Sequence, residues 1–88
     1  MRIRYEKHAE EQLRERGLDK ELIEQTLLAP EQILDSRKNR KIAQKLFIIG
    51  RFKFLVRVIY VIESGGFVVI SAYRTTRIWK YEIKGDGR

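Results

Sequence analysis

The chain has 88 residues with 19 Lys and Arg, 12 Asp and Glu, one histidine and no cysteine, which gives a formal net charge of +7. This length suits one domain over residues 1–88. Disulfides and thiolate metal sites are excluded and one histidine is too few for a histidine-based zinc site, so we expect neither metal nor cofactor. No apolar stretch is long enough for a membrane span and charge follows Met1 at once, so we expect a cytoplasmic protein without a membrane partner.

Helical patterns fill the first third of the chain. The first pattern covers residues 6–16, where apolar side chains recur at helical spacing, and Gly17 supplies a C-terminal stop. The second pattern follows an N-cap at Asp19 and ends before Pro30, because the residue that precedes a proline is driven out of the helical region. We expect these two helices to form a hairpin.

Strand patterns fill the rest of the chain. Alternate side chains of residues 54–62 are all apolar, and residues 67–73 are apolar on both faces, which favours a central strand. Residues 41–49 alternate in part, residues 33–34 suit a short strand or a turn, and residues 2–4 suit an extended lead-in. The sequence therefore predicts an α+β fold of two layers, in which two N-terminal helices pack on a three- to four-stranded antiparallel sheet.

The positive charge is concentrated in the predicted sheet. Residues 1–35 carry six basic and nine acidic side chains, whereas residues 36–88 carry thirteen basic and three acidic ones. Residues 37–61 hold eight basic side chains, Lys45 among them, and no acidic one. Such an uncompensated field predicts a polyanionic partner, most simply RNA or DNA. The alternative is a basic domain whose charge serves solubility alone.

His8 is the only histidine, the residue type that most readily exchanges a proton near neutral pH. It falls in the first turn of the first predicted helix, and Gln12 and Arg16 share its stripe one turn apart. A histidine beside a guanidinium can transfer a proton while the cation steadies a phosphate. The alternatives are structural: His8 fills the junction between helix and sheet, and Arg16 interacts with the negative end of its helix.

Arg57 lies in the middle of a strand whose neighbours are mostly apolar. A buried guanidinium without a partner is costly, so this side chain must either meet a carboxylate or line an open groove. In a groove its planar fork suits phosphate. The structural alternative is an ion pair with Glu15 or Glu63.

The segment from Tyr73 to Tyr81 alternates cations with aromatic side chains, a composition suited to single-stranded nucleic acid, because cations meet phosphates and flat rings stack on bases. We expect Trp79 to cover the edge of the sheet, with Arg74 and Tyr81 facing solvent. The candidate RNA-binding residues are Arg16, Lys45, Tyr73, Arg74, Arg77 and Lys80.

Cleavage of RNA requires no metal, since the ribose 2′-hydroxyl can attack its own phosphate once a base takes its proton. A cation must then stabilise the added charge on the phosphate, and an acid must protonate the leaving oxygen. We predict that His8, Arg57 and Tyr81 form this catalytic set, with His8 as base or acid and Tyr81 as its counterpart.

Three short motifs resemble the uncharacterised RelE-like family called domain of unknown function 4258, within the RelE/ParE toxin superfamily. They are His8-Ala9 followed by Arg16-Gly17-Leu18, then residues 27–30 (Leu-Leu-Ala-Pro), then residues 67–73 (Phe-Val-Val-Ile-Ser-Ala-Tyr). By this resemblance His8 and Arg16 match the motif of the first helix, and Lys80 and Tyr81 are similar to the C-terminal basic and tyrosine positions of RelE-type nucleases.

The resemblance implies a single RelE-like domain that acts as the toxin of a toxin–antitoxin system. Its implied activity is a metal-independent ribonuclease that cleaves RNA, in some relatives on the ribosome, and its implied partner is an acidic antitoxin protein. RelE nucleases that act on the ribosome usually lack a histidine at the start of the first helix, so His8 fits the uncharacterised branch better. Two alternatives remain open: a non-catalytic module that binds RNA or protein, and a ParE-like inhibitor of gyrase.

Overall fold

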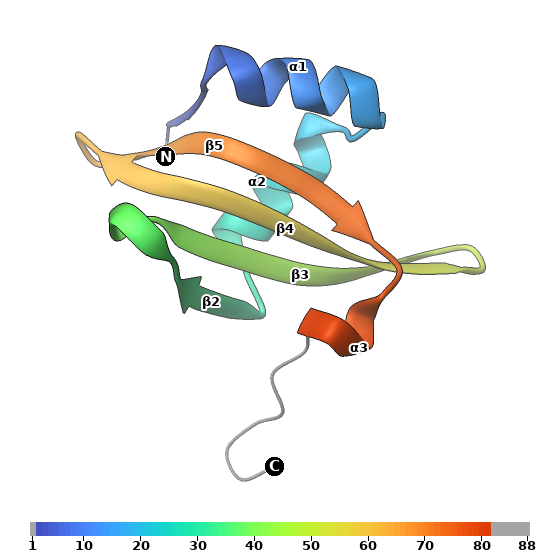
Figure 1. Ribbon diagram of the computed structural model, residues 1–88. Helices are drawn as coiled ribbons and strands as arrows, with labels where there is room; N and C mark the ends of the chain where they lie inside the picture. Colours follow the sequence, from blue (N-terminus) through green and yellow to red (C-terminus); the bar gives the residue numbers. More distant parts are fainter. Residues whose placement is uncertain (1, 82–88) are drawn as a thin grey trace, which may run out of the picture.

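The computed structural model describes residues 2–81, which form one five-stranded sheet and three α-helices (Figure 1). The elements in chain order are β1 (Ile3–Tyr5), α1 (Lys7–Arg16), α2 (Lys20–Leu28), β2 (Gln32–Asp35), a short 3₁₀ helix η1 (Arg37–Asn39), β3 (Lys41–Ile49), β4 (Phe52–Glu63), β5 (Gly66–Thr75) and α3 (Ile78–Tyr81). The strand order is β1-β5-β4-β3-β2, so β4 is central and β5 lies next to it.

The predicted sheet of three or four antiparallel strands beneath two N-terminal helices is wrong. The sheet has five strands and is mixed, because β1 precedes both helices and pairs in parallel with β5, while β2 adds an antiparallel edge to β3. A three-residue strand has too few side chains to show a period of two, and its partner lies more than sixty residues along the chain. The local sequence pattern of residues 2–4 therefore indicates an extended backbone, but it does not show that the segment pairs with the sheet.

Close approach of backbones fixes β1 at its place. Phe67 N donates to Arg2 O at 2.9 Å and Glu6 N donates to Val69 O at 3.1 Å, so the parallel pair is bonded at both ends. A Cβ atom on Gly66 would lie only 2.9 Å from Arg2 O. Glycine at the start of β5 is thus what allows β1 to reach the edge.

The two predicted helices are confirmed almost to the residue. Gly17 ends α1 in the left-handed conformation at φ 61°, and Leu18 N donates to Leu13 O at 3.0 Å. Ala9 and Leu13 point into the core, which the helices share with one face of the sheet. The largest side chains with no exposed surface are Ile23, Thr26, Val56, Val58 and Val69.

The sheet has a core face and an opposite face that α1 and α2 do not cover. On β4, Val56 and Val58 belong to the core, so Leu55 and Arg57 point to the opposite side, called here the open face. Figure 1 shows α2 behind the sheet, α1 along the outer side of β5, and α3 below the sheet, after the loop that follows β5. None of the α-helices between residues 2 and 81 has the length and apolar character needed to cross a membrane.

Candidate functional site

Arg57 lies at the centre of a polar cluster on the open face. It sits opposite Gln44 on β3 and Tyr73 on β5. Its Nε donates to Gln44 Oε1 at 2.9 Å, and its Nη1 donates to Tyr73 Oη at 2.5 Å. The arginine is 9% exposed and the glutamine 2%, so both polar side chains are held within the sheet. The neighbouring strands therefore fix the direction of the guanidinium.

A β-bulge in β5 brings Tyr73 to this cluster. Ile59 pairs with Ser71 and Tyr60 pairs with Val69, so Ile70 is an extra residue without a partner on β4. Val69 points into the core. Strict alternation would send Ser71 and Tyr73 to the core as well, but the extra residue reverses the alternation and turns both side chains to the open face.

The short helix α3 adds Tyr81 to the cluster. The guanidinium carbon of Arg57 lies 4.2 Å from the centre of the Tyr81 ring and 5.8 Å from that of Tyr73. Gln44 Nε2 donates to the backbone oxygen of Tyr81 at 3.2 Å, which attaches α3 to the sheet. Lys80 Nζ lies 5.5 Å from the Tyr81 ring. We call Gln44, Arg57, Tyr73 and Tyr81 the arginine cluster.

The positive charge of Arg57 has no carboxylate partner among residues 2–81. Glu63 instead accepts from Arg4 Nη2 at 3.0 Å, and Glu15 is exposed on α1 without an ion pair in the described part of the chain. The structural alternative for Arg57, an ion pair with either glutamate, is therefore not formed. Within the described part of the chain, its charge is surrounded by neutral dipoles and aromatic faces.

One nitrogen of the guanidinium has no hydrogen-bond partner among residues 2–81 and is not completely buried. Arg57 Nη2 has no hydrogen-bond partner among residues 2–81, yet Tyr5 Oη is the only buried side-chain atom without a partner there. Arg57 Nη2 must therefore reach the surface. Since a guanidinium carries five N–H donors, N–H groups of Arg57 remain for an anion that approaches the open face.

The two tyrosines of the cluster have opposite proton affinities. A hydrogen bond from the Tyr73 hydroxyl lowers the pKa of Tyr81, and the positive charges of Lys80 and Arg57 lower it further. Burial raises the pKa of Tyr73 and outweighs the lowering by its hydrogen bond with Arg57. Tyr81 is thus the phenol of this pair that gives up its proton first, and it stands beside two cations that favour its anion.

A second polar group joins α1 to β5. His8 Nε2 lies 2.9 Å from Gln12 Nε2, and Gln12 Oε1 accepts from Ser71 Oγ at 2.7 Å. Arg16 Nη1 donates to Ala72 O at 2.7 Å and also lies 3.4 Å from Gln12 Oε1. We call His8, Gln12, Arg16 and Ser71 the histidine group.

The two polar groups are neighbours on the open side of β5 but are not in direct contact within residues 2–81. Ser71 and Tyr73 point the same way two residues apart, a separation of about 7 Å along a strand. The structure thus brings Arg57 and Tyr81 together. His8 lies at the far end of the histidine group and forms its hydrogen bond with Gln12.

The remaining predicted RNA-binding residues are more dispersed. Lys45 pairs with Val56 on the core face and its Nζ donates to Ala29 O at the end of α2, at 2.9 Å. Arg74 and Arg77 border a groove of about 600 Å³ at the end of the sheet. Its lining residues are Phe52, Phe54, Arg74, Thr75, Thr76 and Arg77.

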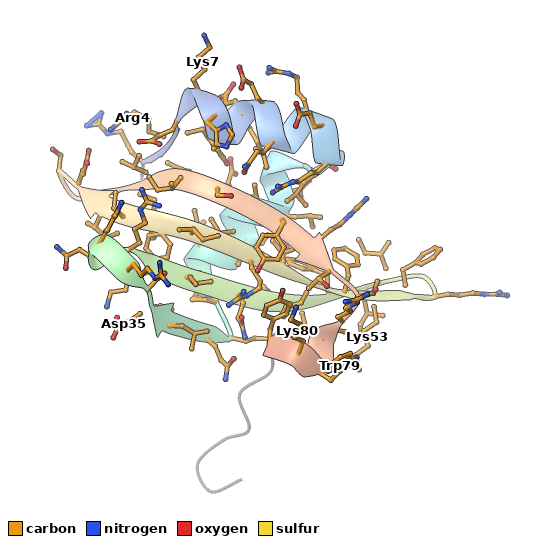
Figure 2. The ribbon with its side chains drawn as sticks, viewed as in Figure 1. Arg4, Lys7, Asp35, Lys53, Trp79 and Lys80 are labelled. Carbon is orange, nitrogen blue, oxygen red and sulfur yellow. The ribbon has the colours of Figure 1, made fainter. Side chains whose placement is uncertain are left out.

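The expectation that Trp79 covers the sheet edge is wrong, because its side chain is 75% exposed. Figure 2 shows Trp79 and Lys80 on α3, with Lys53 of β4 at the same end of the molecule. This end of the sheet therefore presents an exposed ring among cations. Among residues 2–81, no three His, Asp or Glu side chains gather closely enough to hold a metal ion.

Sequence reasoning missed Gln44 and Ser71. Gln44 is a polar residue in the first half of β3, directly after the buried Ala43. A polar side chain at this position of a strand could have indicated a buried hydrogen-bond partner for Arg57. Ser71 has no such signal, because its side of the sheet depends on the bulge at Ile70.

A family model described as a domain of unknown function (DUF4258) matches residues 5–74. The chain matches no curated protein and no solved structure. The matched range contains the whole histidine group, together with Gln44, Arg57 and Tyr73, and ends before Tyr81. The match covers most of the 88 residues, so the chain belongs to the DUF4258 family.

Proposed function

We propose that this protein is a RelE-like toxin that binds single-stranded RNA across the open face of its sheet and cleaves it by attack of the ribose 2′-hydroxyl. No metal is required for this reaction. The toxin role is supported by the resemblance of its motifs to the RelE/ParE superfamily. The ribonuclease role is supported by the arginine cluster.

The observation that carries the proposal is the uncompensated charge of Arg57. The buried guanidinium is held by neutral side chains and has no carboxylate partner among residues 2–81. Such a charge lowers the stability of the folded protein, and a bound anion would offset this loss. Its open Nη2 suits a non-bridging phosphate oxygen. Arg77 and Lys80 follow the end of β5 near Tyr81 and would meet a neighbouring phosphate, whereas Arg74 pairs with Val56 and so points to the other face of the sheet.

The arrangement of Tyr81 supports the chemical step. As phenolate it would take the proton of the 2′-hydroxyl, and the 2′-oxygen would then form a bond to the phosphorus atom. Arg57 would stabilise the negative charge that develops on the phosphate. The bond to the 5′-oxygen would break, and this oxygen would take a proton from water. The products would be a 2′,3′-cyclic phosphate and a 5′-hydroxyl end.

An end-labelled RNA incubated with the pure protein in EDTA tests the reaction. We expect cleavage to a 2′,3′-cyclic phosphate, and we expect Tyr81→Phe to slow it by about 10²- to 10⁴-fold, the usual contribution of a general base. Tyr5→Phe is the matched control, because it removes a phenol from β1 outside the arginine cluster. Absence of cleavage of both free and ribosome-bound RNA would refute the ribonuclease role.

The non-catalytic alternative uses the same surface. Binding that weakens steeply with salt but yields no product would favour an RNA-binding module over a nuclease. The proposed partner, an acidic antitoxin, would compete with RNA for these cations. A small acidic protein encoded beside this one that blocks both binding and cleavage would support the toxin role.

A further inference from the structure

The orientation of the Gln12 side chain is fixed by atoms that can only donate or only accept. Ala72 O is a backbone acceptor in β5 and holds Arg16 Nη1 at 2.7 Å. Arg16 has no acceptor atom, so the Gln12 atom 3.4 Å from the same nitrogen must be its carbonyl oxygen. Ser71 Oγ is 2.7 Å from that oxygen and can serve as donor. The amide nitrogen of Gln12 consequently faces the imidazole ring.

This orientation determines which nitrogen of His8 carries the proton. Gln12 Nε2 bears two hydrogens and no available lone pair, and it lies 2.9 Å from His8 Nε2. The ring nitrogen must therefore accept, so the proton of a neutral ring belongs on Nδ1. A proton on Nε2 would face the amide N–H group, and a flipped amide would place its N–H group against Arg16.

The acceptor that His8 would need as a general base is consequently already occupied. The ring is exposed, and its Nδ1 has no hydrogen-bond partner among residues 2–81. An exposed N–H donor, connected to the Arg16 guanidinium through the Gln12 amide, suits an anionic oxygen. This role differs from the proton transfer that the sequence predicts for His8.

We propose that Arg16 and Gln12 hold His8 as its neutral Nδ1–H tautomer, so that His8 binds a phosphate oxygen of RNA as a hydrogen-bond donor and does not take a proton from it. The part that concerns RNA rests on the proposed function, whereas the tautomer does not. Arg16 and Gln12 are positioning residues, because they act through the imidazole. His8 would contact a nucleotide adjacent to the one at Arg57.

A nitrogen-15 NMR spectrum of the whole protein tests the tautomer directly, since one histidine gives one set of ring signals. At a pH where the ring is neutral, we expect Nδ1 to be protonated and Nε2 to be bare. A wild-type ring protonated on Nε2 would overturn the proposal. This readout requires neither RNA nor activity.

Gln12→Glu is the sharpest variant, because it changes little besides the atom that faces the ring. Its carboxylate can still accept from Ser71 and Arg16, and a Glu–Arg pair four residues apart is favourable on a helix. Since a carboxylate only accepts, we expect the neutral ring to switch to Nε2–H. Gln25→Glu, at an exposed position of α2, is the matched control and should leave the ring signals unchanged. An unaltered Nδ1–H signal in Gln12→Glu would show that Gln12 does not set the tautomer of His8.

Arg16→Met tests whether Arg16 sets the orientation of the Gln12 amide. Without the donor, both amide orientations of Gln12 are allowed, and we expect the ring to become a mixture of the two tautomers. A ring that stays wholly Nδ1–H would show that Arg16 does not set the orientation.

The binding role is tested with a short single-stranded oligoribonucleotide in a fluorescence anisotropy titration. The side-chain nitrogen of Asn can occupy the place of Nδ1, so His8→Asn should keep the affinity within about threefold, whereas His8→Ala should lose roughly tenfold or more. Equal losses in both variants would refute the donor role. If the wild-type protein binds no RNA, the proposed function fails while the NMR result still decides the tautomer.

Discussion

Replacement of Arg57 by methionine separates a functional arginine from a structural one. The substitution removes two hydrogen bonds donated by a charged group, to Gln44 and Tyr73, which together contribute about 3–6 kcal/mol. Burial of the methionine side chain beside Leu55 returns about 1.5–3 kcal/mol, and the cost of holding an unpaired cation in the sheet disappears. We therefore expect the free energy of unfolding to fall by about 2 kcal/mol or less.

RNA binding should respond quite differently. A charge-assisted hydrogen bond to phosphate is worth about 1.5–3 kcal/mol, so Arg57→Met should weaken binding of a single-stranded oligoribonucleotide by roughly 10- to 100-fold. The slope of log affinity against log salt should fall by about 0.7, the value for one phosphate contact on a single strand. Arg51→Met, at an exposed position between β3 and β4, is the matched control and should weaken binding by less than about threefold.

Urea denaturation and anisotropy titrations on the same samples show whether Arg57 serves stability or RNA binding. A loss of stability of about 3 kcal/mol or more would show that Arg57 is structural, since this is the usual cost of breaking a buried ion pair. An affinity equal to that of Arg51→Met would show that its charge does not face RNA. Either result would refute the reasoning that places phosphate at Arg57.

Three further predictions concern Tyr81 and the core. Tyr73→Phe removes the hydrogen bond that lowers the pKa of Tyr81, so that pKa should rise, and the acid limb of the kcat/KM profile for RNA cleavage should move to higher pH; an unmoved limb would exclude Tyr81 as the base. Ile23→Ala should cost about 2–5 kcal/mol in urea denaturation because its side chain has no exposed surface, whereas Leu28→Ala, at 61% exposed, should cost less than about 1 kcal/mol. Tyr5→Phe deletes a buried hydroxyl without a partner in residues 2–81 and should leave stability unchanged or raise it by about 1 kcal/mol; a clear loss of stability would reveal a missing partner.

Elements with strong local signals are predictable from this sequence. The two helices are bounded by Gly17 and Pro30, and the predicted strand at residues 41–49 coincides with β3. These boundaries depend on backbone preferences of single residues and on side-chain period, which the sequence displays directly. The longer strands β4 and β5 exceed their predicted ranges by only one or two residues at each end.

Features that depend on distant partners are not predictable in the same way. The sequence marks residues 2–4 as extended, but only pairing with the backbone of β5 makes residues 3–5 a strand. The site shows the same limit. Arg57 and Tyr81 can be singled out by residue type, but the bulge at Ile70 that turns Tyr73 toward Arg57 has no local signal. Their roles in RNA cleavage remain predictions until the experiments above are done.

The parallel pair of β1 and β5 has a consequence for synthesis of the chain. β1 leaves the ribosome before the other described elements, and its partner β5 emerges more than sixty residues later, so the parallel pair cannot form until then. The hairpin of β3 and β4 can form earlier, but Arg57 then lacks both Tyr73 and Tyr81. If the proposed toxin acts through this cluster, the nascent polypeptide is harmless to its own ribosome until β5 and α3 have emerged.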